Sequence, residues 1–138
     1  TSRAFEGLPA VYREVILLLE VKVLFNLDRA MQTGGNKVIV VEGFFDALKV
    51  HQAGYPAVVA LMGSAFSERQ SELLLSHFAS VTLMLDGDQP GRRATDVMAK
   101  LLRPKARVHL VELPNRVQPD QLSSAEINVL VGPPNRTS

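Results

Sequence analysis

The sequence predicts an α/β fold in which about four mostly parallel strands form a sheet with helices on both faces. Four short blocks of β-branched and aliphatic residues alternate with longer segments that have helical periodicity. Short turns join these segments, and the alternation favours right-handed crossover connections between parallel strands. The chain has 138 residues, of which 46% are hydrophobic and 21% charged, and this is enough for one ordinary core.

The N-terminal residues 1–30 are predicted to form a helical segment that leads into the main domain. Residues 8–27 are rich in good helix formers, and Val15, Leu19 and Val23 recur at helical spacing. A Gly-Gly-Asn sequence then interrupts the pattern before the first strand. We therefore expect a helix over residues 8–27.

The first strand is predicted over residues 38–41, because consecutive β-branched residues are typical of a strand buried on both faces. Glu42 follows at the carboxyl end of this strand. Helical spacing returns over residues 44–53, until Gly54 and a following proline stop it. A second buried strand is predicted over residues 57–61.

The next helix has a clear beginning after a predicted turn at a Gly-Ser pair. Ser67 is a predicted N-cap because Gln70 follows it by three residues, as in a capping box. An amphipathic helix is expected over residues 68–78. The third strand is predicted over residues 81–85, and it ends at Asp86.

The rest of the chain continues the alternation. Residues 90–102 are predicted to be helical, with a proline near the first turn, and residues 107–111 form the fourth strand. The main domain is predicted over residues 31–122. Residues 123–138 follow it as a short helix, residues 124–131, and a loose tail.

Composition excludes several classes of site. Lys and Arg total 15 against 14 Asp and Glu, so the net charge is +1 and any affinity for nucleic acid must come from local patches. The absence of cysteine excludes a disulfide framework, a thiolate zinc site and a cysteine nucleophile. The longest apolar stretches are far shorter than the roughly 20 residues of a membrane-spanning helix. We expect no membrane partner and a cytoplasmic location.

Three acidic side chains, Glu42, Asp86 and Asp88, lie at or just beyond the carboxyl ends of predicted strands. Open α/β sheets bind ligands at that edge, where the side chains of neighbouring strands converge. Because converging carboxylates repel one another, an oxygen-only cluster predicts a hard cation, Mg²⁺ or Mn²⁺, and a phosphate-bearing substrate. Gly43 and Gly87 leave room for a backbone or a phosphate to come close. Alone, an Asp-Gly-Asp sequence is more often a surface turn.

Basic and aromatic residues bear on the substrate. Arg92 and Arg93 fall in the first turn after the acidic loop, where we expect phosphate contact, although a basic run is usually a solvated helix face. Lys22 and Lys37 are expected to line the opposite side of a groove. The six phenylalanines are mostly at core-like positions and there is no tryptophan, so no base-stacking platform is expected. The scattered histidines are expected to be structural or surface residues.

Two motifs are similar to those of the Toprim domain, which bacterial DnaG-type primases share with topoisomerases, small nucleases and recombination proteins. Residues 40–46, Val-Val-Glu-Gly-Phe-Phe-Asp, resemble the first motif, a glutamate after a buried strand with an aspartate four residues later. Residues 85–94 contain D-G-D-x-x-G-x-x-A, which resembles the second motif in its primase form. The resemblance covers roughly residues 24–122 and implies a Toprim, Rossmann-like fold.

The resemblance implies a role for each matched residue. Glu42 is implied as a general acid or base or as a metal ligand, and Asp86 and Asp88 as Mg²⁺ ligands, so that the three form the catalytic set. Asp120 is implied as an accessory metal ligand. Gln118 stands where primases have a further acid, and this departure removes one negative charge from the site.

Three residues are expected to position the metal ligands without binding the metal themselves: Asp46, Gly43 and Gly87. Asp46 lies one turn into the helix that follows Glu42. There it either caps the helix and holds the scaffold, or supports the metal ligands through hydrogen bonds.

The resemblance implies the catalytic Toprim domain of a primase-like protein, a nucleotidyltransferase that uses Mg²⁺ to synthesise RNA primers on a DNA template from nucleoside triphosphates. The resemblance also implies a replicative helicase as a partner, contacted through domains outside this chain. It implies a location at the bacterial nucleoid. The isolated chain is expected to be inactive or weakly active. Two alternatives stay open: a small Toprim-family nuclease that hydrolyses DNA or RNA phosphodiesters, and a non-catalytic Toprim module that binds nucleic acid or a replication partner.

Overall fold

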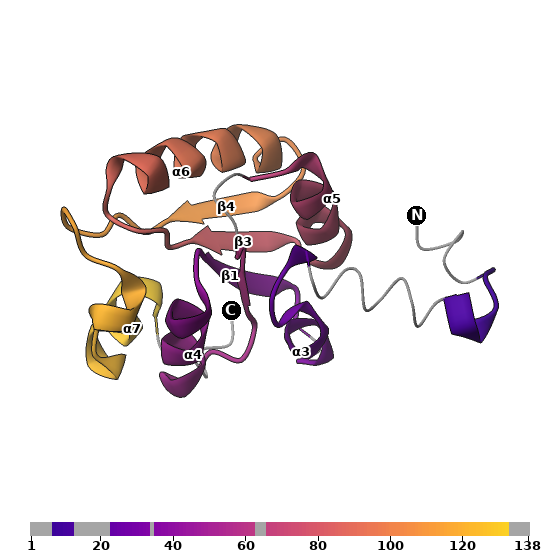
Figure 1. Ribbon diagram of the computed structural model, residues 1–138, viewed down its shortest axis with the longest axis horizontal. Helices are drawn as coiled ribbons and strands as arrows, with labels where there is room; N and C mark the ends of the chain where they lie inside the picture. The colour runs from indigo at the N-terminus through magenta and orange to yellow at the C-terminus, as the bar shows by residue number, and fades with distance from the viewer. Residues whose placement is uncertain (1–6, 13–22, 34, 63–65, 133–138) are drawn as a thin grey trace.

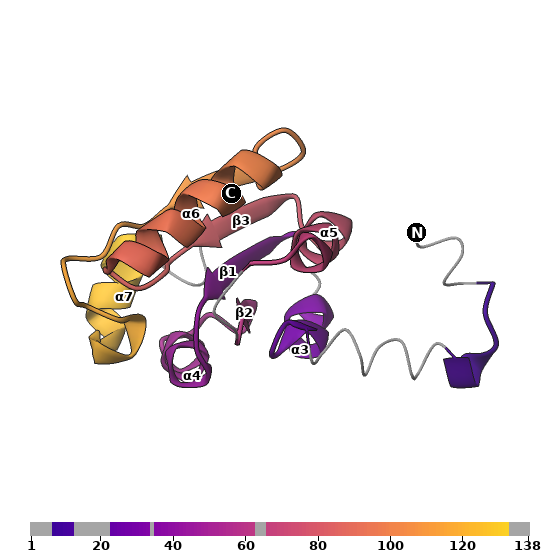
Figure 2. The ribbon, with the colours of Figure 1, turned by 45° about the horizontal axis from the view of Figure 1, so that its top comes forward.

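A four-stranded sheet with the strand order β2-β1-β3-β4 lies at the centre of the molecule (Figure 1 for β1, β3 and β4, Figure 2 for β2). The computed structural model describes residues 7–12, 23–33, 35–62 and 66–132. The strands are β1 (Lys37–Val41), β2 (Val58–Ala60), β3 (Ser80–Leu83) and β4 (Arg107–Leu110). Every neighbouring pair is parallel, which confirms the predicted α/β sheet.

Helices pack on both faces of this sheet, as predicted (Figure 2). They are α3 (Leu27–Gln32), α4 (Phe44–Gln52), α5 (Glu68–His77), α6 (Gln89–Leu102) and α7 (Ser124–Val131), with a short 3₁₀ helix η1 (Pro119–Gln121) before α7. Side chains alternate along a strand, so Val38 and Val40 of β1 pack with α3, α5 and α6. Ile39 and Val41 pack on the other face with α4 and α7. Both faces of β1 are therefore buried, which explains its unbroken β-branched sequence.

The predicted helix boundaries after the first strand are confirmed to within a residue or so. The Ser67 Oγ accepts the Gln70 N–H at 3.2 Å, and the Gln70 Oε1 accepts the Ser67 N–H at 3.1 Å, which is the predicted capping box. Gly54 ends α4 with a φ of 106°, a left-handed conformation that glycine adopts without strain. The predicted turn at Gly63 lies outside the described residues.

The prediction of a continuous helix over residues 8–27 is wrong at its carboxyl end, and residues 13–22 lie outside the described part of the chain. Phe25 forms an antiparallel bridge with Ala60, in which the Phe25 N–H donates to the Ala60 carbonyl at 2.9 Å and the Ala60 N–H donates back at 3.1 Å. Asn26 then turns with a φ of 71°. The edge of β2 offers unpaired backbone groups, so this long-range pairing overrides the local helical propensity.

Packing extends past both ends of the predicted main domain, residues 31–122. Leu27 of α3 is part of one core cluster, and Ile127 of α7 is part of the other. The predicted boundaries themselves remain predictions. Within the described residues, no helix is long and apolar enough to cross a bilayer.

Candidate functional site

The carboxyl ends of β1 and β3 bring two of the predicted acids together. The two strands are parallel neighbours in which Val40 pairs with Leu83. Glu42 follows β1 directly, and its Oε2 accepts the backbone N–H of Asp86 at 2.7 Å. β3 ends two residues earlier than predicted, so Asp86 lies three residues past the strand. The structure therefore brings Glu42 and Asp86 together at the carboxyl ends of the strands, as predicted. We call this end of the sheet, with Glu42, Asp86 and Asp88, the acidic edge.

Asp86 has the most perturbed carboxyl group of this edge. Its side chain is half-buried, and its Oδ1 is a buried oxygen without a hydrogen-bond partner among the described residues. Burial, followed by the negative charge of Glu42, raises the pKa of Asp86 to about 7. A carboxylate in this setting is stabilised by taking up a proton or by binding a cation.

Asp88 holds the beginning of α6. Its Oδ1 accepts the Gly91 N–H at 2.7 Å, which makes Asp88 the N-cap of the helix, with Pro90 in the first turn. This hydrogen bond engages one carboxylate oxygen and fixes the side chain next to Asp86. The capping role was missed in the sequence, although an aspartate just before a proline-containing first turn is a recognised N-terminal signal.

Asp46 connects two loops of the acidic edge. The side chain is only 6% exposed, and its two oxygens accept the N–H groups of Gly43 at 3.2 Å and Asp120 at 2.9 Å. Burial raises the pKa of Asp46, while these backbone donors act in the opposite direction. Asp46 therefore joins the loop after β1 to η1, and it places Asp120, whose side chain is exposed, beside this edge. Of the two roles considered for Asp46, the geometry favours the scaffold.

The loop that carries Asp86 and Asp88 is clamped by a second loop, residues 113–117. The Gly87 N–H donates to the Val117 carbonyl at 2.8 Å, and the Arg116 N–H donates to the Gly87 carbonyl at 2.6 Å. A Cβ on Gly87 would overlap the carbonyl oxygen of Pro114. The space expected beside Gly87 is thus occupied by backbone rather than left for a phosphate.

The predicted basic residues are placed differently from one another. Arg92 donates to the Asn115 Oδ1 at 2.8 Å and braces the clamping loop, whereas Arg93 is exposed and donates to the Gln89 Oε1 at 3.2 Å. Lys37 begins β1 and so lies at the opposite edge of the sheet from Glu42. Lys22 lies outside the described residues. The structure does not bring Lys37 to the acidic edge. Of the predicted basic residues that it describes, Arg92 and Arg93 are the two near this edge.

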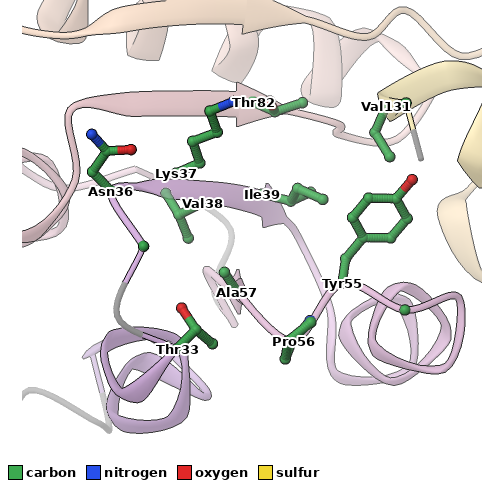
Figure 3. Close-up of a pocket in the computed structure, with 13 residues that line it drawn as sticks. Thr33, Asn36, Lys37, Val38, Ile39, Tyr55, Pro56, Ala57, Thr82 and Val131 are labelled. Carbon is green, nitrogen blue, oxygen red and sulfur yellow. The ribbon is translucent and has the colours of Figure 1, made fainter. Parts of the chain in front are cut away.

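Two cavities lie at opposite edges of the sheet. One of about 330 Å³ adjoins the acidic edge and is bordered by Asp86, Arg92 and Glu112. The other, of about 480 Å³, lies at the amino ends of the strands, where Lys37 and Tyr55 border it (Figure 3). The acidic edge thus has its own adjoining hollow, separate from the larger one.

Two of the five phenylalanines that the structure describes are exposed, although the phenylalanines were expected mostly at core-like positions. Phe44 and Phe45, which begin α4, are 39% and 70% exposed. Sequence reasoning missed them because an aromatic pair after a buried strand has the same local pattern as a core helix. The sequence did contain a signal for their position near the site, since both phenylalanines directly follow Glu42 and Gly43 in the first motif.

Mg²⁺ or Mn²⁺ fits the donor set of this edge. Magnesium usually takes one or two carboxylates and completes its shell with water and substrate phosphates. Glu42 and Asp86 adjoin one another, and the Asp86 Oδ1, for which no described residue is a hydrogen-bond partner, is a ligand atom that a cation would satisfy. In the described ranges, no three His, Cys, Asp or Glu side chains are grouped as a ready-made metal cage. The predicted set of Glu42, Asp86, Asp88 and Asp120 is thus gathered at one edge without forming a four-carboxylate centre.

The chain is similar to known proteins in sequence and in fold. The family model described as Toprim-like matches residues 39–123. The DNA primase of Staphylococcus epidermidis is 36% identical over 102 residues, which are 72% of this chain and 17% of that protein. The structure of Aquifex aeolicus primase, with its zinc-binding and RNA polymerase domains, has a TM-score of 0.69 at 32% identity and covers 78% of this chain and 28% of its own.

A DnaG primase catalytic domain bound to single-stranded DNA has a TM-score of 0.67 at 26% identity, and the match covers 77% of this chain and 37% of that one. The chain spans about a sixth of the length of the curated relatives it matches. The family match includes Glu42, Asp86 and Asp88 and extends over more than half of the chain. The chain therefore belongs to the Toprim-like family, and its fold resembles the Toprim domain in the catalytic core of bacterial DnaG primases.

Proposed function

We propose that this chain is the metal-binding catalytic domain of a DNA primase, in which Mg²⁺ or Mn²⁺ supports nucleotidyl transfer from nucleoside triphosphates during RNA primer synthesis on a DNA template. The observation that carries the proposal is the contact between Glu42 and Asp86, with a buried Asp86 oxygen that has no hydrogen-bond partner in the described part of the chain. Relatives named DNA primase support the same reaction class. Such a role places the chain at the replicating nucleoid.

The residues of the acidic edge have different proposed roles. Glu42 and Asp86 are the proposed cation ligands, and the cation supplies Lewis-acid stabilisation of phosphate charge. Glu42 also fixes the Asp86 backbone through its Oε2, which leaves Oε1 to bind a cation or to accept a proton. Asp88 caps α6 with Oδ1, so its second oxygen is the one proposed to face the cation.

The surrounding groups orient this pair. Asp46 holds the Gly43 loop and Asp120 in place, and Asp120 is proposed as an accessory ligand for a hydrated cation. Arg93 is exposed on the first turn of α6, where it is proposed to bind a substrate phosphate. Arg92 acts by bracing the loop that contains Asn115.

Primer synthesis tests the proposal when the family-matched segment, residues 39–123, replaces the corresponding segment of the Staphylococcus epidermidis primase. The chimera is expected to make RNA primers on single-stranded DNA with Mg²⁺, and Glu42→Gln is expected to lower the rate by about 100-fold or more. Glu72→Gln, which changes an exposed acid on α5, is the matched control and is expected to leave the rate unchanged.

Two results would contradict the proposal. One is a folded chimera that makes primers equally well with Glu42→Gln. The other is cleavage of DNA or RNA by the 138-residue chain with Mg²⁺, lost in Glu42→Gln, together with no primer synthesis by the folded chimera, because that outcome identifies a nuclease.

A further inference from the structure

Two adjacent aromatic side chains are exposed beside the acidic edge. Phe44 is 39% exposed and Phe45 70% exposed, and they form the first turn of α4. Phe45 follows Glu42 by three residues, so their Cα atoms are at most about 11 Å apart. A large apolar side chain that is this exposed has to be explained by what it contacts.

We propose that Phe45, supported by Phe44, stacks on a base of a single-stranded DNA whose backbone passes the acidic edge. The inference rests on the proposed function, because it adds contact with a base to the phosphate contacts of the same site. Base stacking on an aromatic ring is tolerant of sequence, because every base has a flat face.

The aromatic pair is held in a fixed position. The Phe44 ring packs against Phe25 at a centroid distance of 4.9 Å, and Phe45 packs edge-to-face on Phe44 at 5.4 Å. Phe25 is itself fixed by its backbone bridge to Ala60. The Asp46 carboxylate accepts the Gly43 N–H at 3.2 Å and fixes the beginning of α4. A ring held in this way loses little conformational entropy when a base binds to it.

The shape and size of the surface favour a base. The two faces make up most of the surface of a phenyl ring, so a residue that is 70% exposed has at least one open face. Leu48, one turn further along α4, is 41% exposed, and Met62, whose backbone N–H donates to the Glu42 carbonyl, is 52% exposed. With about 200 Å² for each side chain, the four expose about 400 Å², which is half of the roughly 800 Å² per partner in a stable protein interface. The patch is small for a protein partner and large enough for one or two bases.

The experiment follows the Phe45 ring protons of the 138-residue chain by NMR while a hexamer of thymidine nucleotides is added in EDTA. A stacked base is expected to shift these protons upfield. A hexamer of abasic nucleotides, which keeps the phosphates and lacks the bases, is expected to leave them unshifted.

Three substitutions at one position separate stacking from general apolar contact. Phe45→Ala is expected to weaken binding of the thymidine hexamer about 5- to 100-fold, and Phe45→Leu to weaken it nearly as much. Phe45→Tyr is expected to keep wild-type affinity. Val129→Ala, at an 85% exposed position on α7, is the matched control and is expected to have no effect.

Several results would overturn the proposal. One is that Phe45→Ala binds the thymidine hexamer as tightly as wild type, and another is that Phe45→Leu does so. A third is that Phe45→Ala loses as much affinity for the abasic hexamer as for the thymidine hexamer. Ring shifts that follow protein concentration and not oligonucleotide would identify contact between copies of the chain, and would also refute it.

Failure of this inference can be told apart from failure of the proposed function. The same sample, freed of EDTA, is titrated with Mn²⁺. Metal binding without a Phe45 shift would refute only the stacking, whereas a Phe45 shift without metal binding would refute only the catalytic role of the acidic edge.

Discussion

Replacing Gly87 with alanine tests whether the acidic loop is clamped as described. The added Cβ would overlap the Pro114 carbonyl oxygen, and the next nearest atom, the Leu113 carbonyl oxygen, is 2.9 Å away. Both neighbours are backbone, so no flexible side chain can move aside. The loop has to open, and this strains the hydrogen bonds between Gly87 and the residues Arg116 and Val117.

The size of the effect follows from these contacts. Overpacking of a close-packed site costs about 1 to 3 kcal/mol, and each lost hydrogen bond costs about 1 kcal/mol. Because opening the loop relieves the overlap as it breaks the bonds, Gly87→Ala is expected to lower the free energy of unfolding by about 2 to 4 kcal/mol. That is a large part of the roughly 5 to 15 kcal/mol that stabilises an ordinary domain.

Urea unfolding, followed by circular dichroism, measures this loss. Gly35→Ala is the matched control, because a Cβ there would meet only the Thr33 Oγ1 at 3.9 Å, an ordinary contact, and the expected change is within about 0.5 kcal/mol. If Gly87→Ala is no less stable than Gly35→Ala, the close approach of the two loops is not as described, and the argument for a rigid acidic loop fails.

Three further predictions concern the caps and the titration of the site. Asp88→Asn keeps an N-cap of equal quality, so the free energy of unfolding in urea is expected to change by less than about 0.5 kcal/mol while the affinity for Mn²⁺ falls. A fall in Mn²⁺ affinity that comes with a clear loss of stability would argue against a separate role for the second oxygen. Ser67→Ala removes the capping box of α5 and is expected to cost about 1 kcal/mol in the same assay, and an unchanged midpoint would contradict the cap. The pKa of Asp86 is raised from 3.8 to about 7, so without metal the chain is expected to lose stability as the pH rises from 4 to 7. Since the group is partly exposed, the loss is discounted to about 1 to 2 kcal/mol. Asp86→Asn is expected to remove most of this slope, and Asp46, whose pKa is also raised by burial, contributes the rest. An undiminished slope in the variant would assign it to other groups.

Much of the fold was predictable because local signals and burial agree. The β-branched block that becomes β1 is buried on both faces, and the helix predicted over residues 124–131 is α7 without any shift of its ends. Ser67 and Gln70 predicted the start of α5, because a capping box is specified by residues only three apart. In each case the determining contacts lie within one element or between an element and the core.

The N-terminal helix was mispredicted where a distant contact decides the structure. Residues near Phe25 have helical periodicity, yet the backbone of Phe25 pairs with Ala60, which lies 35 positions further along the chain. Nothing in the local pattern reveals that the edge of β2 is open at that point. Asn26 reinforces the break, because its Nδ2 donates to the Val58 carbonyl at 2.9 Å.

The candidate site likewise has features that the sequence predicts and features that it does not. The proximity of Glu42 and Asp86 was predictable, because parallel strands end at one edge and both acids follow such strands. The hydrogen bonds that clamp Gly87 and the contact of Arg92 with Asn115 were not predictable, since they depend on the path of a loop more than 20 residues away. The exposure of Phe45 also depends on which face of α4 meets the sheet.

The central claim is that the acidic edge binds a divalent cation, and a calorimetric titration of the chain with Mn²⁺ and with Mg²⁺ at pH 8 tests it most directly. The account predicts saturable binding that Asp86→Asn and Glu42→Gln each weaken at least tenfold, and that Asp28→Asn, at an exposed acid on α3, leaves unchanged. Absence of saturable binding, or equal binding by wild type and Asp86→Asn, would contradict it.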